Sequence, residues 1–221
     1  MQQWTALVAG GTGLVGRSLA ERLSVAGDVG MAVSLVRRNS GAKLPKFREF
    51  KTDFDRLRLL PDLRPRAAFC CLGTTIRTAG SQEAFRRVDH HYVLAFARAA
   101  REAGAETFCV VSSVGADAAS GNFYLSTKGE MERDLEALGF PALHVMRPSL
   151  LLGKRTEKRP AERLGMLGGR LVAPLLLGTL RRYRPIQADT VAAALLAAAR
   201  LPPAGTQAHE YDAIRALAAG A

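Results

Sequence analysis

The chain has few of the residues from which disulfide frameworks, metal centres and membrane spans are built. Three cysteines and four histidines stand among 221 residues, and their spacing is not typical of a metal site. Cys70 and Cys71 are neighbours in one apolar run and Cys109 lies in another, so we expect buried thiols and no disulfide. The apolar stretches 171–180 and 191–201 fall short of the roughly 20 residues that a bilayer requires. A membrane-spanning helix and a disulfide-rich secreted fold are therefore excluded.

Acidic residues and targeting signals are also scarce. Acids number 20 against 31 basic residues, which gives a formal net charge of +11, and six of the basic residues are lysine. Such a surplus favours anionic partners, either the phosphates of a nucleotide or a nucleic acid. The first five residues lead directly into an apolar segment without the basic region of a secretory signal, so we expect a cytoplasmic protein.

The order of the predicted elements indicates the fold. Apolar runs predict strands over 5–9, 31–36, 46–51, 67–72, 107–111 and 142–146. Helical spacing predicts helices over 14–25, 81–104, 122–138 and 190–200. Strands that alternate with helices are typical of an α/β protein with a doubly wound parallel sheet. We predict a single domain over residues 1–221, with a small irregular substrate-side insertion at 153–185.

Two helix details can be checked directly. Ser81 is expected to cap the helix over 81–104, and Asp189 the helix over 190–200. The first of these helices is expected to pack on the sheet through one apolar stripe, made of Ala84, Phe85, Val88, Tyr92, Phe96 and Ala99.

A glycine-rich turn follows the first predicted strand. It satisfies the pattern G-x-G-x-x-G between a strand and a helix and reads Gly10-Gly11-Thr12-Gly13-Leu14-Val15-Gly16. In that setting glycines let the backbone approach a pyrophosphate lying on the helix N-terminus. The alternative, a turn that merely packs closely, is less favoured by this context. The turn predicts an NAD(P)-binding, Rossmann-like domain.

The end of the second strand bears on the choice of dinucleotide. An acid there would bind the ribose 2′-hydroxyl of NAD, whereas an arginine accommodates the 2′-phosphate of NADP. The chain has Arg37 and Arg38 there, with no acid between Met31 and Arg38, so we predict NADP (NADPH). A solvated strand end is the alternative interpretation. Asp53, after the third strand, would either hydrogen-bond the adenine amino group or cap a helix ahead of Asp55.

Tyr124 and Lys128 form a candidate acid–base pair. They stand four residues apart at the start of a predicted helix, so their side chains project from one face. An adjacent ammonium stabilises a phenolate, which makes the tyrosine a better proton donor at neutral pH. Ser112 and Ser113 end the preceding strand, at the edge where open α/β sheets bind ligands. The alternative is an ordinary tyrosine at a helix start and a solvated lysine.

Other chemistries are less well supported. The chain contains neither a G-x-S-x-G elbow nor a Walker lysine, which disfavours an α/β-hydrolase and a P-loop NTPase. No metal site is predicted. The basic stretches 154–159 and 181–184 are interleaved with a single aromatic residue, Tyr183, so a solvated or cofactor-covering loop is favoured over a nucleic-acid platform.

With these motifs the chain resembles an atypical short-chain dehydrogenase/reductase, and more narrowly the Tat-interacting-protein type of that superfamily. The resemblance covers most of residues 1–165. Besides the glycine turn, it is carried by Cys70-Cys71-Leu72-Gly73-Thr74-Thr75, Val88-Asp89 with Tyr92-Val93, Ser112-Ser113 with Gly115-Ala116-Asp117, Tyr124-Leu125, Lys128-Gly129-Glu130 with Glu132, Arg147-Pro148 with Leu151-Leu152, and Arg159-Pro160.

The resemblance implies NADPH held by the glycine turn and the arginine pair, with Leu72 and Gly73 beside the cofactor. It places Tyr124 and Lys128 on the nicotinamide side. It also adds Phe85, Leu151 and Arg159 as candidate cofactor contacts.

Two positions depart from the superfamily pattern. Its dehydrogenases usually carry an asparagine in the helix after the fourth strand, where it completes a proton relay, whereas this helix reads Val88-Asp89-His90-His91. The catalytic serine would be Ser112 or Ser113, with Val114 as a third occupant of that position.

The predicted function is that of an NADPH-dependent reductase, in which a small carbonyl compound receives a hydride and Tyr124 donates the proton. The resemblance also implies the alternative of an NADP(H)-binding regulatory protein with little turnover, because family members are implicated as cofactor sensors. The partner would be a second copy or another protein, and no membrane association is expected. Nucleic-acid binding through the net charge ranks third.

Overall fold

A seven-stranded parallel sheet forms the centre of the computed structural model, which describes residues 3–153 and 176–220. The strand order is β3-β2-β1-β4-β5-β6-β9. The strands are β1 (Trp4–Ala9), β2 (Val29–Val36), β3 (Phe47–Lys51), β4 (Ala67–Cys70), β5 (Thr107–Val111), β6 (Ala142–Met146) and β9 (Gly205–His209). The order reverses between β1 and β4, which is where doubly wound sheets leave a ligand crevice.

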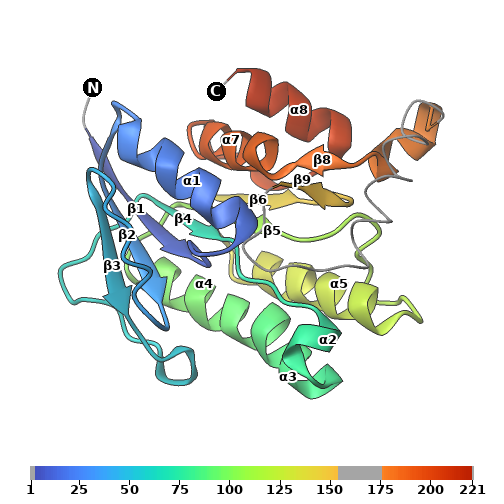
Figure 1. Ribbon diagram of the computed structural model, residues 1–221, viewed down its shortest axis with the longest axis horizontal. Helices are drawn as coiled ribbons and strands as arrows, with labels where there is room; N and C mark the ends of the chain where they lie inside the picture. Colours follow the sequence, from blue (N-terminus) through green and yellow to red (C-terminus); the bar gives the residue numbers. More distant parts are fainter. Residues whose placement is uncertain (1–2, 154–175, 221) are drawn as a thin grey trace.

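Helices cover both faces of this sheet (Figure 1). One layer contains α1 (Leu14–Val25), α7 (Ala188–Ala198) and α8 (Tyr211–Ala219), and the other contains α4 (Tyr92–Glu102) and α5 (Phe123–Glu136). Alternate residues of β1 point into the two cores, with Val8 in the first and Leu7 in the second. Burial on both faces explains why the central strands are continuously apolar. The predicted doubly wound α/β fold is confirmed.

Shorter elements complete the described chain. They are α2 (Ile76–Ala79), α3 (Gln82–Arg86), the π-helical turn η2 (Arg87–His91), the 3-10 helices η1 (Phe54–Arg56) and η4 (Gly178–Tyr183), and the parallel pair β7 (Leu151–Leu152) and β8 (Ile186–Gln187). The predicted insertion at 153–185 falls mostly on residues 154–175, which lie outside the described ones. In the described part of this segment, Arg181 pairs with Asp212 of α8 at 2.7 Å. The basic stretch 181–184 is therefore held against α8.

The predicted cap of the helix over 190–200 is wrong. Helix α7 begins at Ala188 with Gln187 at the N-cap, and Asp189 lies in its first turn. There the carboxylate pairs with Arg22 of α1 at 2.7 Å, a contact between distant segments that local capping preferences do not register.

The single helix predicted over 81–104 is interrupted by a π turn. Ser81 does cap it, since its hydroxyl accepts a hydrogen bond from the amide of Ala84 at 3.0 Å. A π turn adds one residue to the helical repeat, so the side chains beyond it change face. The buried residues after Phe85 therefore include Asp89, Val93 and Ala100 in place of the predicted Val88, Tyr92 and Ala99, which are only partly buried.

Candidate active site

A cleft of about 980 Å³ opens at the carboxyl ends of β1 and β4, where the strand order reverses. Its walls come from the glycine turn after β1, the end of β2, the loop after β4 and the segment from α2 to α4. The predicted cofactor residues among those that line it are Gly10, Thr12, Gly13, Leu14, Arg37, Arg38, Leu72 and Gly73. The sequence motifs thus converge on the crevice that this topology creates.

The glycine turn is shaped by steric limits that other residues would violate. Gly10 has φ of +81°, and a Cβ there would lie 2.5 Å from the backbone of Cys71. A Cβ on Gly16 would lie 2.1 Å from the carbonyl oxygen of Gly10. Gly13 is the N-cap of α1 and brings no side-chain oxygen to the free amides of the first turn. These amides form a cradle for an anion, which fits the pyrophosphate of a dinucleotide.

The predicted residues Gly11, Val15 and Gly16 lie behind this surface. All three are buried, and a Cβ on Gly11 would meet the hydroxyl of Ser34 at 2.5 Å. These residues therefore pack beneath the turn and stabilise its backbone.

Arginine dominates the charge of the cleft. Arg37 and Arg38 line it at the end of β2 and are exposed, as are Arg17 from α1 and Arg87 from η2. The lining that belongs to the described chain contains no Asp or Glu. The sequence interpretation missed Arg17 and Arg87. Arg17 directly follows the glycine motif, so the sequence could have indicated it. Arg87 is distant from the motifs in the chain, and only the fold brings it to the cleft.

Other predicted cofactor residues lie elsewhere. Asp53 caps η1, because its carboxylate accepts a hydrogen bond from the amide of Asp55 at 3.0 Å, as the second interpretation had it. Phe85 is completely buried, and its ring packs against that of Tyr124 with centroids 5.6 Å apart. Leu151 is half-buried on β7 and packs against the core of the α1 layer. Arg159 falls outside the described residues.

Lys128 is buried and paired with an acid that the motifs did not identify. Its side chain is 5% exposed, and its Nζ lies 2.8 Å from Oδ1 of Asp89. The second oxygen, Oδ2, accepts a hydrogen bond from the amide of Thr74 at 2.8 Å. Burial lowers the pKa of Lys128, but the attraction of Asp89 and then of Tyr124 outweighs this effect and raises it overall. Lys128 therefore stays an ammonium. The signal for Asp89 was an acid in the helix where superfamily dehydrogenases usually carry an asparagine.

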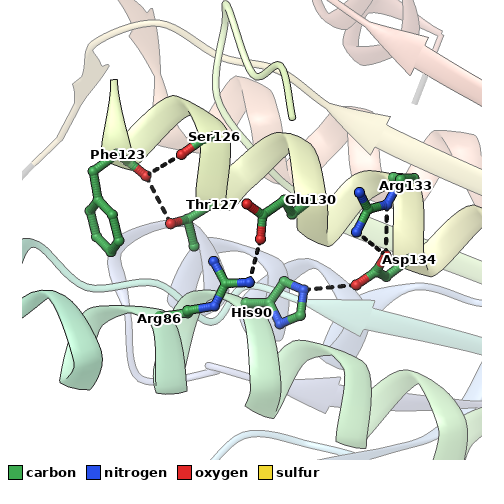
Figure 2. Close-up of polar contacts among 8 residues, drawn as sticks. All are labelled: Arg86, His90, Phe123, Ser126, Thr127, Glu130, Arg133 and Asp134. Atoms are coloured by element: carbon green, nitrogen blue, oxygen red, sulfur yellow. Dashed lines mark hydrogen bonds and ion pairs between the residues drawn. The ribbon is translucent and has the colours of Figure 1, made fainter. Parts of the chain in front are cut away.

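An ion pair and a hydrogen bond hold α5 against α3 and η2 (Figure 2). Arg86 pairs with Glu130, and Nε2 of His90 lies 2.9 Å from a carboxylate oxygen of Asp134. The partners are four residues apart on both helical segments, with Asp89 between Arg86 and His90. The two contacts thus pack α3 and η2 against α5 on either side of Asp89 along the chain.

The two candidate serines differ in their surroundings. Ser112 is buried, and its hydroxyl donates a hydrogen bond to the carboxylate of Glu132 on α5. The same carboxylate accepts a hydrogen bond from Nε of Arg147 at 3.0 Å. Ser113 is half-buried, and its hydroxyl donates to the carbonyl of Val114 at 3.3 Å. Ser112 is thus committed to a buried network that joins β5 to α5.

No group of three His, Cys, Asp or Glu side chains in the described ranges 3–153 and 176–220 could hold a metal ion. Within the same ranges no helix has the length and apolarity needed to cross a bilayer.

Known proteins share both sequence and fold with this chain. The protein HTATIP2 of Rattus norvegicus is 50% identical over 94 residues, 42% of this chain and 38% of that protein. The protein FMP52, mitochondrial, of Coccidioides immitis (strain RS) is 32% identical over 230 residues, 97% of this chain and 93% of that protein. The chain thus matches about two fifths of the rat relative and nearly all of the fungal one.

A likeness to solved structures concerns the fold. The structure of MoeE5 in complex with UDP-glucose and NAD superimposes with a TM-score of 0.67 at 18% identity, covering 98% of this chain and 81% of that chain. The UDP-glucose 4-epimerase of Thermotoga maritima superimposes with the same TM-score, at 14% identity, over 93% of this chain and 76% of that chain.

The expected cytoplasmic location is contradicted. FMP52 relatives from Debaryomyces hansenii, Meyerozyma guilliermondii, Emericella nidulans and Coccidioides immitis are named mitochondrial proteins. The expectation rested on the missing signature of a secretory signal, which does not distinguish the compartments inside a cell.

A family model described as the NAD dependent epimerase/dehydratase family matches residues 6–213. The resemblance to the Tat-interacting-protein type is confirmed by HTATIP2 and FMP52, and the fold by the solved structures. The chain belongs to the NAD dependent epimerase/dehydratase family.

Proposed function

We propose that this protein binds NADP(H) in the arginine-lined cleft and reduces a small carbonyl compound. The observation that carries the proposal is the combination of an anion cradle at α1 with four arginines and no carboxylate on the described walls of the cleft. Arg37 and Arg38 stand where a 2′-phosphate would be recognised, which supports NADP over NAD. When bound, the dihydronicotinamide supplies the hydride that the carbonyl carbon receives.

Residues of α5 and of the segment that follows β5 carry out the other steps. Tyr124 donates its phenolic proton to the carbonyl oxygen, which yields the alcohol. Lys128 stabilises the phenolate that forms and donates hydrogen bonds to the ribose hydroxyls. Ser113 orients the carbonyl oxygen, because it is half-buried and its hydroxyl makes a longer hydrogen bond of 3.3 Å to the carbonyl of Val114, whereas the hydroxyl of Ser112 is held in the buried network of Glu132.

The cofactor part is tested by titrating the protein with NADPH and with NADH and following nicotinamide fluorescence. We expect NADPH to bind at least about tenfold more tightly, since charge-assisted hydrogen bonds to one phosphate are worth about 1.5–3 kcal/mol each. Equal and millimolar binding of both dinucleotides would refute it. The chemical part is tested with a panel of small aldehydes and ketones, on which Tyr124→Phe should abolish the wild-type activity.

A second candidate is an NADP(H)-binding regulatory protein with little turnover, acting on a second copy or another protein. It is supported by the ion pair of Lys128 with Asp89, because an ammonium already held by a carboxylate has less to offer a phenolate. This candidate predicts tight NADPH binding without carbonyl reduction in either the wild type or Tyr124→Phe.

A further inference from the structure

Asp89 is the most deeply buried acid among the described residues, at 1% exposure. A carboxylate removed from water is tolerated only where its oxygens are paired. Both oxygens meet this condition, one at Nζ of Lys128 and one at the amide of Thr74, each at 2.8 Å. The surroundings thus provide for a charged side chain at this position.

The contacts of Asp89 join three segments that meet at the proposed site. Thr74 belongs to the loop after β4, whose residues 71–74 line the cleft. Lys128 belongs to α5, one turn after Tyr124. A Cβ on Gly73 would lie 3.5 Å from Oδ1 of Asp89, so the carboxylate also packs beside that cofactor-side loop. Asp89 therefore ties the lysine to the wall of the cleft.

The groups that face Lys128 show where its counter-charge comes from. They are Asp89 from η2, the phenol of Tyr124 from α5 and the thiol of Cys70 from β4. Burial raises the pKa of the Cys70 thiol to about 12, so that group is uncharged at neutral pH. Asp89 is the carboxylate in this set, and without it burial would push Lys128 toward its neutral form.

We propose that Asp89 is a positioning residue of the proposed reaction, whose carboxylate keeps Lys128 charged and aligned with the cofactor-side loop. The inference rests on the proposed function for its role in binding and turnover. It goes further in assigning a task to Asp89, a charged side chain in the helix where superfamily dehydrogenases usually carry a neutral asparagine.

The charge of Lys128 can be measured without any cofactor. Protein labelled with ¹³C at Cε of its six lysines would be titrated by NMR, and Lys128→Met would assign the signal of interest. In the wild type we expect the Lys128 signal to show no deprotonation up to pH 10. In Asp89→Asn its midpoint should fall by about three pH units or more. Asp134→Asn is the matched control, because Asp134 lies on the same interface and contacts His90.

The role in the site is tested by the pH dependence of NADPH affinity. Wild type and Asp134→Asn should share one pH profile between pH 6 and 9, in which the expected change is a modest weakening as the 2′-phosphate takes up a proton near about pH 6. Asp89→Asn should approach the wild-type Kd at pH 6 and weaken by about tenfold or more at pH 9, as Lys128 loses its proton. Circular dichroism at both pH values would establish that the variant is folded.

A double variant covers the case in which Asp89→Asn does not fold. Asp89→Asn with Lys128→Met leaves no unpaired charge at this contact and should fold, with NADPH binding that is weak and that lacks the loss toward pH 9. A Lys128 signal or a pH profile unchanged by Asp89→Asn would overturn the Asp89 proposal alone. A wild type that binds neither dinucleotide would instead overturn the proposed function, and with it the role of Asp89 in the reaction.

Discussion

Nδ1 of His144 lies 3.1 Å from Nε2 of His209, where β6 and β9 run side by side. The rings stack with centroids 5.3 Å apart, and both residues are buried. Burial lowers the pKa of His144 to about 4, and the charge of His209 acts in the same direction. Burial also lowers the pKa of His209. The pair therefore carries no net charge at neutral pH.

This pair predicts a loss of stability in mild acid. The folded-state pKa of His144 lies below its unfolded value of about 6.5, so the unfolded chain binds more protons between these values. The free energy of unfolding should fall as the pH drops from about 6.5 to 4, by up to about 3 kcal/mol from this histidine. Urea denaturation at pH 7, 5.5 and 4.5 measures the change. A steep loss that persists in His144→Gln would assign the effect to other groups.

The arginine pair at the end of β2 predicts cofactor selectivity. Replacing Arg37 and Arg38 by alanine should weaken NADPH binding by about ten- to a hundredfold, because a doubly charged phosphate loses its cations, and should leave NADH binding within about threefold. Isothermal titration at fixed ionic strength would show the difference. Arg98→Ala, which removes an exposed arginine of α4, is the control for net charge. An equal loss for both dinucleotides would refute 2′-phosphate recognition.

Gly16 offers a steric test of the phosphate turn. In Gly16→Ala the new Cβ would lie 2.1 Å from the carbonyl oxygen of Gly10, so the turn must move. We expect a loss of about 2–4 kcal/mol in the free energy of unfolding, together with loss of NADPH binding. Gly27→Ala is the matched control, since a Cβ there meets no atom within 4 Å. The free energy of unfolding of that variant should lie within about 1 kcal/mol of the wild-type value.

The neighbouring serines should respond differently to alanine. Ser112→Ala removes the hydrogen bond to the buried carboxylate of Glu132 and should cost about 1–3 kcal/mol of stability. Ser113→Ala should change stability by no more than about 0.5 kcal/mol and lower kcat by about ten- to a hundredfold, through loss of the group that orients the carbonyl. Thermal melts and steady-state kinetics separate these effects. The opposite pattern would make Ser112 the catalytic serine.

Much of the fold could be predicted because its signals are local. The bounds of α1, β5 and β6 follow from apolar runs and turn residues that lie next to one another in the chain. The strand β9 was missed because its residues, Gly205–His209, include no long apolar side chain, and it forms a strand by pairing with β6. Its place depends on the neighbouring strand rather than on its own propensity.

The candidate site also has a part that the sequence predicts and a part that it does not. The glycine turn and the arginine pair are contiguous motifs, and both line the cleft. The pairing of Asp89 with Lys128 joins residues that are far apart in the chain. It depends on a π turn, which the spacing of apolar residues does not predict. The choice between Ser112 and Ser113 depends on Glu132, a partner on another element. Motifs thus locate the cleft, but they do not describe its buried charges.

Helix α5 carries Tyr124, Lys128 and Glu132 at intervals of one turn, so it bears the phenol, the ammonium and the anchor of Ser112 on a single rod. A displacement of α5 along its axis would shift the phenol, the ammonium and the carboxylate that binds Ser112 by the same amount. Their mutual spacing would survive such a movement, while their distance from the amides of the glycine turn would change. The geometry of the site therefore depends on how α5 is placed relative to the glycine turn and the loop after β4. The hydrogen bond from the amide of Thr74 to Asp89 is one of the contacts that fix this placement.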